Sequence, residues 1–494
     1  MNANIYALFA AAAETAGDRP CIIEGDTVRL RFDELNSATA AYANALVNAG
    51  ARVGDRIVVQ VEKSIENVLL YLGAIRAGLV YVPLNTAYTA AELDYFIGDA
   101  EPAVVVCDPA KADRIAAVAG KATLLTLGTD GTGTLIDRLA PGPFETVARG
   151  TDDLAAILYT SGTTGRSKGA MLTHANLLSN ALTLKALWGW RDDDVLIHIL
   201  PIYHVHGLFV ALHGALLAGA TVLFHRTFDP ARVIADFAQG TVLMGVPTHY
   251  TRLTTMPELT PQTCAHMRLF ISGSAPLLAE AHQRFEEKTG QRILERYGMT
   301  ETGMITSNPY QGGERVAGTV GYPLPAVEVR IGEGGSGPGV LEVRGPNVFA
   351  GYWRMPEKTK EEFREGGWFV TGDVAEIAPD GRVTLVGRAK DLIIAGGLNI
   401  YPKEIEEAID ALPGVEESAV IGVPHPDMGE GVVAVVARAK GAELTEEAIL
   451  SGIAGGLARF KQPRRAIIVD ALPRNAMGKV QKAALRAEYG ALFA

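Results

Sequence analysis

Residues 159–169, YTSGTTGRSKG, combine the residue types that hold polyphosphate. Three glycines let the backbone turn tightly, while hydroxyl and backbone N–H groups can donate hydrogen bonds to phosphate oxygens. Arg166 and Lys168 add positive charge. The four-residue gap and the Gly-Lys-Ser/Thr ending of a Walker A loop are missing. The stretch therefore predicts a different phosphate cradle, against the alternative of an ordinary surface loop, with these candidates for phosphate binding: Thr160, Ser161, Gly162, Thr163, Thr164, Gly165 and Lys168.

The elements around this loop have to position it. The apolar run 154–158 is typical of a buried strand, and a helix is expected from about His174 to Trp188, so the predicted order is strand, loop, helix. Strand-length apolar runs alternate with helical patterns through the first half of the chain, which predicts an α/β fold with a parallel sheet. The expected strands are 55–61, 103–107, 195–200, 221–224 and 241–245, and the expected helices are 65–77, 91–97, 208–217 and 231–237.

The second half of the chain has a different texture. After about Val320, short β runs separated by Gly and Pro turns predict a small antiparallel β subdomain. From about Asp391 the pattern is that of a small α+β unit. We therefore expect a large N-terminal domain, residues 1–388, built of stacked αβ subdomains plus the antiparallel subdomain, and a small α+β C-terminal domain, residues 389–494.

Composition restricts the class of protein. A chain of 494 residues is too long for one hydrophobic core. Its net charge of -11 argues against a general nucleic-acid or anionic-membrane surface. Three widely spaced cysteines suit a reducing compartment, and no stretch is apolar enough to span a bilayer. We expect a cytoplasmic protein with no nucleic-acid or membrane partner.

Five segments, taken together and in order, resemble the adenylate-forming acyl-CoA synthetase family. They are the opening loop, 295–301 (ERYGMTE), 368–373 (WFVTGD), 387–391 (GRAKD) and the segment around Lys479. The resemblance covers nearly the whole chain. It implies a two-domain acid–thiol ligase that uses ATP and CoA as substrates and Mg²⁺ as cofactor, and forms an acyl-AMP before an acyl-CoA.

The resemblance also implies roles for nucleotide-binding residues. Tyr297 would stack on adenine, Thr300 would bind the α-phosphate region, and Glu301 would hold Mg²⁺. A hard cation requires oxygen ligands and offsets the charge that repels a carboxylate nucleophile. Asp373, which we expect in a turn after Thr371-Gly372, would accept hydrogen bonds from the ribose hydroxyls with Arg388 beside it. The remaining ATP-binding candidates are Ser274, Ala275 and Pro276.

Residues of the C-terminal domain are implied in both half-reactions. Lys479 matches the family lysine that stabilises charge developing at the α-phosphate. Lys390 matches the hinge about which a mobile C-terminal domain rotates, and Gly396 and Gly397 would line the CoA tunnel. An exposed lysine in a Gly-containing loop also motivates the hypothesis that a lysine acetyltransferase modifies Lys479.

Arg296 is the most informative residue for the choice of acid. The family typically has glycine there, opening onto a long acyl pocket, whereas an arginine fills that space and requires a carboxylate partner. The pattern predicts a short dicarboxylate held by Arg296, with His206 and Ser272 or Ser274 as helpers and His206 also as a catalytic candidate. Within the family these segments look most like malonyl-CoA synthetases, which also accept methylmalonate.

Other interpretations remain open from the sequence. Arg296 could pair with Glu295 or another carboxylate, and a short monocarboxylic or an aromatic acid would then be the expected substrate. The acyl group could pass to a carrier protein rather than to CoA. A catalytically silent nucleotide-binding homologue is the alternative from another class, although Lys168, Glu301 and Lys479 are all present.

Overall fold

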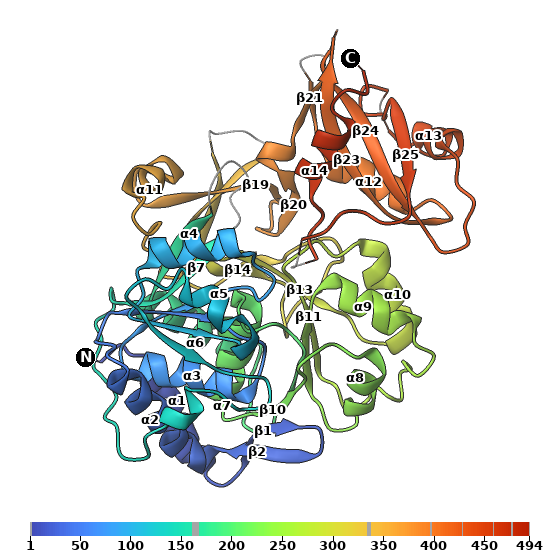
Figure 1. The fold of residues 1–494 in the computed structure, drawn as a ribbon. Coiled ribbons are helices and arrows are strands. Elements are labelled where there is room, and N and C mark those ends of the chain that lie inside the picture. Colours follow the sequence, from blue (N-terminus) through green and yellow to red (C-terminus); the bar gives the residue numbers. More distant parts are fainter. Residues whose placement is uncertain are drawn as a thin grey trace.

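The computed structural model describes residues 2–160, 167–332, 337–395, 398–426, 428–457, 459–475 and 478–493. This part of the chain folds into α/β layers around four sheets, with the last sheet in a separate C-terminal domain (Figure 1). The three cysteines are buried free thiols. No helix in the described part of the chain is long and apolar enough to cross a membrane.

The first large sheet has six strands in the order β6-β5-β3-β4-β7-β8. Its strands are parallel except for β8, which pairs antiparallel with β7 through Thr160 and Lys168. The bounds are β3 Arg56–Gln60, β4 Val80–Pro83, β5 Val104–Cys107, β6 Thr123–Thr126, β7 Leu154–Thr160 and β8 Lys168–Thr173, with helices α3 Ile65–Arg76, α4 Ala90–Ala100 and α5 Ala112–Ala116.

The predicted order of strand, loop and helix around residues 159–169 is wrong. The chain forms strand β8 immediately after the loop, and only then begins helix α6, His174–Leu187. The reason is the apolar run 169–172, which pairs with β7 and buries Ala170 and Leu172. Lys168 is therefore held on a strand by backbone hydrogen bonds. Thr173, the residue before the helix, caps it, since its side chain accepts a hydrogen bond from the Asn176 backbone N–H.

The second large sheet has nine strands in the order β15-β14-β13-β12-β11-β9-β10-β1-β2. The six strands from β13 to β1 run parallel, and antiparallel strands close both ends. The strands are β1 Pro20–Glu24, β2 Thr27–Arg31, β9 Val195–His198, β10 Thr221–Phe224, β11 Val242–Gly245, β12 Leu269–Ser272, β13 Leu294–Met299, β14 Gly303–Ser307 and β15 Tyr322–Pro323.

Helices connect these strands. The segment predicted as a helix from 208 to 217 begins earlier, as a π-helix over His206–Leu212 followed by α7, His213–Ala218. Such π-turns are frequent at functional sites, and this one starts at a predicted site residue. The others are α1 Tyr6–Ala16, α2 Phe32–Asn48, α8 Pro230–Asp236, α9 Pro247–Thr255 and α10 Ala279–Thr289.

The predicted antiparallel subdomain is confirmed as a five-stranded sheet. It contains β16 Glu328–Ile331, β17 Gly339–Arg344, β18 Phe363–Arg364, β19 Trp368–Ile377 and β20 Val383–Arg388, with helix α11, Pro356–Glu362, beside it. The chain then passes through a short 3₁₀ helix, Ala389–Asp391, into the next sheet. The change of sheet falls where we predict the domain boundary and the hinge Lys390.

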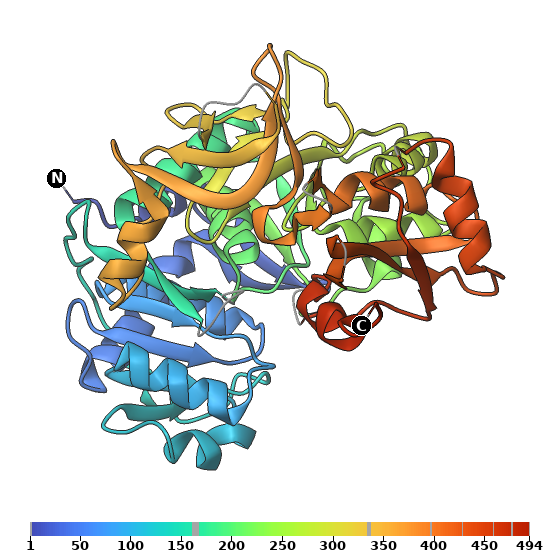
Figure 2. The ribbon, with the colours of Figure 1, turned by 90° about the horizontal axis from the view of Figure 1, so that it is seen from above.

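The C-terminal domain has its own hydrophobic cores on the two faces of a five-stranded sheet. Figures 1 and 2 show it, in orange and red, against the large domain on the side of α9 and α10. Its elements are β21 Ile393–Ala395, β22 Leu398–Ile400, α12 Pro402–Asp410, β23 Val415–His425, β24 Gly429–Arg438, α13 Glu446–Ala454, β25 Arg465–Val469 and α14 Lys482–Tyr489.

Candidate active site

Parallel strands bring the predicted acid-binding residues to one edge of the nine-stranded sheet. β11, β12 and β13 are neighbours, and Ser272 pairs in register with Glu295. Ser272 therefore ends β12 beside Arg296 on β13, while His206 comes from the segment after β9. Ligands of open α/β sheets bind outside the carboxyl ends of the strands, and this edge is such a place.

Arg296 is buried, and no described residue forms an ion pair with it. The residue is 3% exposed, and Nε and Nη2 have no hydrogen-bond partner among the described residues. Burial lowers the pKa of the guanidinium to about 9, so that it remains charged at neutral pH. A Cβ at Gly273 would stand 2.4 Å from Arg296 Cζ, so the absence of a side chain there admits the guanidinium against the loop backbone. A buried, charged and unpaired arginine is stabilised when an anion enters its pocket.

His206 and two serines complete this cluster. Ser274 Oγ lies 3.2 Å from His206 Nδ1, and His206 Nε2 is buried with no partner in the described part of the chain. Burial, followed by the charge of Arg296, lowers the pKa of His206 well below its usual range, so the ring is neutral. Ser274 has a φ of 70°, a strained conformation typical of functional sites. Ser272 Oγ is also buried, and no described residue hydrogen-bonds to it.

The cluster therefore gathers unused polar groups that can bind a carboxylate. If Ser274 donates to Nδ1, His206 carries its proton on Nε2 and becomes a neutral donor toward the same space as Arg296. The predicted alternative, in which Arg296 pairs with Glu295, does not describe this arrangement. Glu295 Oε1 instead contacts His282 Nδ1 at 3.1 Å.

The predicted ribose-binding residues form a second cluster. Tyr297 donates a hydrogen bond to Asp373 Oδ2, and Arg388 Nε lies 2.7 Å from Asp373 Oδ1. Asp373 is not in a turn as predicted: it lies within β19, paired with Arg388 on β20. Gly372, the residue before it, has a φ of 72° and makes the strand irregular where the sequence predicts a turn. The strand pairing holds the Asp373 carboxylate and the Arg388 guanidinium on adjacent strands.

A third cluster surrounds Glu301. This carboxylate is 5% exposed and burial raises its pKa. Tyr352 can donate to Glu301 Oε1 at 3.2 Å and to Glu362 Oε2 at 2.7 Å. Lys168 Nζ, which we expect at the phosphates, lies 2.7 Å from Glu362 Oε1. Thr300 lies half-buried in the turn between β13 and β14.

Lys479 reaches these clusters from the C-terminal domain. Its backbone N–H donates to Asn475 Oδ1 at 3.0 Å. The side chain keeps solvent-accessible surface, but loss of hydration, followed by the charge of Arg388, lowers its pKa. Asp373 and Glu301 act on it in the opposite direction, so Lys479 lies within electrostatic reach of both nucleotide-side carboxylates.

Most predicted site residues thus converge on one region between the domains. Ala275 and Pro276 follow Ser274 in the loop before α10, and Lys390 is exposed in the 3₁₀ helix Ala389–Asp391. The predicted phosphate-loop residues Ser161, Gly162, Thr163, Thr164 and Gly165 and the predicted CoA residues Gly396 and Gly397 lie outside the described residues. The described residues contain no group of three or more His, Cys, Asp or Glu arranged to hold a metal.

Sequence reasoning missed Gly273, Tyr352 and Glu362. A glycine between two serines does not indicate, from sequence alone, that the Arg296 side chain packs against it. Tyr352 follows a glycine, as many loop residues do, and Glu362 ends a charged helical segment. Each becomes informative only through a contact with a residue far away in the chain.

Comparison with known proteins extends this picture. The chain superimposes on the ATP-bound crystal structure of MatB from Rhodopseudomonas palustris with a TM-score of 0.96 and 56% identity, each chain being fully covered. For the apo structure of the same protein, at equal identity and coverage, the TM-score is 0.85. The arrangement here is therefore closer to that of the ATP-bound structure than to that of the apo structure.

Curated relatives are more distant and differ in their acids. A feruloyl-CoA synthase of an Amycolatopsis species is 35% identical over 93% of this chain and 94% of its own. The malonate–CoA ligase of Arabidopsis thaliana is 35% identical over 88% of this chain and 78% of its own. Residues 9–353 match the AMP-binding enzyme family and residues 404–479 match the AMP-binding enzyme C-terminal domain. The chain belongs to the AMP-binding enzyme family, whose members include CoA ligases.

Proposed function

We propose that this protein is an ATP-dependent malonate–CoA ligase that also accepts methylmalonate. The observation that carries the proposal is the buried, unpartnered Arg296 beside the unused donors of His206 and Ser272. A short dicarboxylate supplies the missing anion: one carboxylate accepts from Arg296 and His206 while the other faces the nucleotide. The similarity to MatB and to malonate–CoA ligases supports the same assignment.

The first half-reaction joins the acid to AMP. A free carboxylate oxygen attacks the α-phosphorus of ATP, the bond to the β-phosphate oxygen breaks, and acyl-AMP and pyrophosphate form. Lys479, held near Asp373 and Glu301, stabilises the negative charge that develops at the α-phosphate. Asp373 and Arg388 hold the ribose, Tyr297 packs against adenine, and Lys168 holds the departing phosphates.

Glu301 fits the proposed Mg²⁺ cofactor. It is a buried carboxylate, and burial raises its pKa. The Tyr352 hydroxyl is the side-chain donor that reaches it in the described part of the chain, so a cation that prefers oxygen ligands would compensate its charge. When bound, Mg²⁺ would offset the phosphate charge that repels the incoming carboxylate. Thr300, in the adjacent turn, would contact the α-phosphate region.

The second half-reaction transfers the acyl group. The C-terminal domain rotates about Lys390, which withdraws Lys479 and opens the CoA path past Gly396 and Gly397. The CoA thiolate attacks the acyl carbon, AMP leaves with its phosphate oxygen, and the thioester remains. The domain limits 1–388 and 389–494, a cytoplasmic location and acetylation of Lys479 by a lysine acetyltransferase belong to the same proposal.

The substrate is tested by CoA-dependent AMP release with a panel of acids. We expect malonate and methylmalonate to be used far better than acetate, propionate or ferulate. Fast turnover of an unbranched or aromatic monocarboxylate with no malonate activity would contradict the dicarboxylate assignment and favour the alternative suggested by the feruloyl-CoA synthase relative.

The division of labour between half-reactions is tested with Lys479→Ala. Loss of one charge-stabilising donor slows adenylation by about 10²- to 10³-fold. We expect thioester formation from preformed acyl-AMP to continue at the wild-type rate. Equal loss of both half-reactions would contradict the proposed withdrawal of Lys479.

A further inference from the structure

Lys168 is held in place by more than its own strand. Residues 350–353 run antiparallel beside β8, with Met171 N–H donating to Gly351 O at 3.0 Å and Trp353 N–H donating to Gly169 O at 2.7 Å. Ala170 and Tyr352 face each other in this pairing. The pairing places Lys168 Nζ 4.1 Å from the centre of the Tyr352 ring, within cation–π distance.

Glu362, the last residue of α11, completes the set of contacts around Lys168. Its Oε1 accepts from Lys168 Nζ at 2.7 Å and its Oε2 accepts from the Tyr352 hydroxyl at 2.7 Å. The Tyr352 backbone N–H donates to Thr359 Oγ1 at 2.9 Å, which ties α11 to the segment beside β8. Both oxygens of this one carboxylate are therefore used to fix Lys168 and the ring beneath it.

The placement of Glu362 has an electrostatic cost that its neighbours offset. A carboxylate at the last residue of a helix meets the negative end of the helix dipole. Burial alone would raise the pKa of Glu362, but hydrogen bonds from Lys168 and Tyr352 hold it below its usual range. The carboxylate is therefore ionised, with Lys168 at 2.7 Å as its nearer cation and Lys358 Nζ at 3.3 Å on the solvent side.

Tyr352 connects Glu362 and Lys168 to Glu301. Burial, followed by the charge of Glu301, raises the pKa of the phenol, which stays protonated. Its single proton can go to Glu301 Oε1 or to Glu362 Oε2. The carboxylate proposed to hold Mg²⁺ and the lysine proposed to hold the departing phosphates are thus joined through Tyr352 and Glu362.

We propose that Glu362 is a positioning residue that sets Lys168 for the β- and γ-phosphates of ATP, which rests on the proposed adenylation. It restrains Nζ between a carboxylate and an aromatic face, so less side-chain entropy is lost when the phosphates bind. Glu362 acts on the phosphates through Lys168, and its bond with Tyr352 leads to Glu301, which is also a phosphate-side group. Glu362 therefore affects the half-reaction in which the β- and γ-phosphates are present, not the one that starts from acyl-AMP.

The test compares Glu362→Gln with Glu361→Gln, the same chemical change one residue earlier. Glu361 is exposed and pairs with Lys358 at 2.9 Å. Loss of one charge-assisted hydrogen bond to Lys168 raises the Kd for Mg-ATP and the KM for pyrophosphate in exchange about tenfold. We expect thioester formation from acyl-AMP and the thermal midpoint to stay unchanged, and Glu361→Gln to leave every quantity unchanged.

A double variant separates positioning from a structural role. In a Lys168→Ala background, Glu362→Gln should produce little further loss in Mg-ATP affinity, because the contact that positions Lys168 is already gone. The proposal would be overturned if the losses in Mg-ATP affinity of the two single variants multiplied in the double variant. It would also be overturned if Glu362→Gln slowed both half-reactions equally or bound Mg-ATP more tightly than wild type. The Mg-ATP titration contains no acid, so its result does not depend on which acid the enzyme uses.

Discussion

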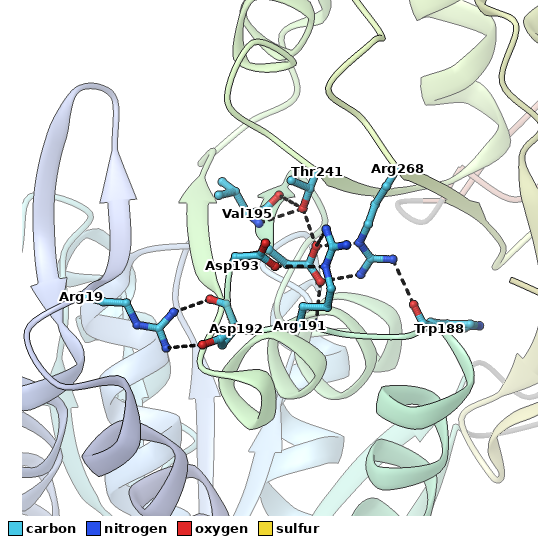
Figure 3. A network of polar contacts seen from close by, with 9 residues as sticks. Arg19, Trp188, Arg191, Asp192, Asp193, Val195, Thr241 and Arg268 are labelled. Carbon is cyan, nitrogen blue, oxygen red and sulfur yellow. Dashed lines mark hydrogen bonds and ion pairs between the residues drawn. The ribbon is translucent and has the colours of Figure 1, made fainter. Parts of the chain in front are cut away.

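Buried Arg296 and largely buried Arg268 lie at opposite ends of the strands of the nine-stranded sheet and differ in what surrounds them. Arg268 precedes β12, at the amino edge, and Arg296 lies on β13, toward the carboxyl edge. Arg268 Nε and Nη2 lie 2.6 and 2.5 Å from the two oxygens of Asp194, and Nη1 donates to Trp188 O at 3.1 Å (Figure 3). Arg296 Nε and Nη2 have no such partner within the described ranges of the chain.

The Arg268 network is closed on itself. Asp194 Oδ1 also accepts from Thr241 Oγ1 at 2.8 Å, and Thr241 Oγ1 accepts from the Val195 N–H at 2.9 Å (Figure 3). These contacts join the residue before β9, the residue before β11 and the residue before β12. The paired arginine therefore holds strands together, whereas the unpaired one is left available for a ligand. Burial alone does not distinguish the two roles, but satisfaction of hydrogen bonds does.

Arg268→Met should have the largest effect on stability. It removes the nearer cation of a fully buried Asp194 carboxylate and leaves the more exposed Arg191 guanidinium at 3.8 Å. This loss costs about 3–5 kcal/mol of unfolding free energy. The midpoint of the large-domain transition in urea measures this loss, since a chain with separate domain cores need not unfold in one step. An unchanged midpoint would mean that the closed network does not hold the strands.

Arg296→Met should have a smaller effect of opposite sign on the ligand-free protein. It replaces an unpaired buried charge with an apolar side chain of similar length and raises the unfolding free energy by about 1–2 kcal/mol. The same urea midpoint measures the gain, with Arg268→Met as the matched variant. A loss as large as that of Arg268→Met would show that Arg296 is a structural arginine after all.

The double variant Asp194→Leu with Arg268→Met should have the smallest effect. It removes both charges of the closed network, so neither is left buried alone, and the midpoint should return to within about 1 kcal/mol of wild type. Additive losses would instead indicate that the pair itself contributes most of the stability at this edge.

The fold class could be predicted from the sequence, for physical reasons. Alternating apolar runs determine the parallel sheets, and the carboxyl ends of parallel strands necessarily meet at one edge. Motif residues such as Tyr297, Glu301 and Asp373 carry their chemistry in their residue types. Their convergence near Lys479 followed from the family resemblance.

What the sequence could not predict were pairings between distant residues. Strand β8 was missed because its hydrogen bonds to β7 outweigh the local signal of a loop leading into a helix. Asp373 was assigned to a turn because Gly372 interrupts a strand pattern. The contact of Lys168 with Glu362 spans 194 residues, and no local pattern announces it.

The most direct test of the account is acid-dependent ATP/pyrophosphate exchange by wild type and Arg296→Met with malonate and propionate. Propionate matches malonate except for the distal carboxylate. Losing a charge-assisted, desolvated contact of this kind costs about 2–5 kcal/mol, or roughly 30- to 4,000-fold in kcat/KM. We predict that loss for malonate with propionate exchange retained or raised. An equal loss for both acids would contradict the assignment of Arg296 to the distal carboxylate.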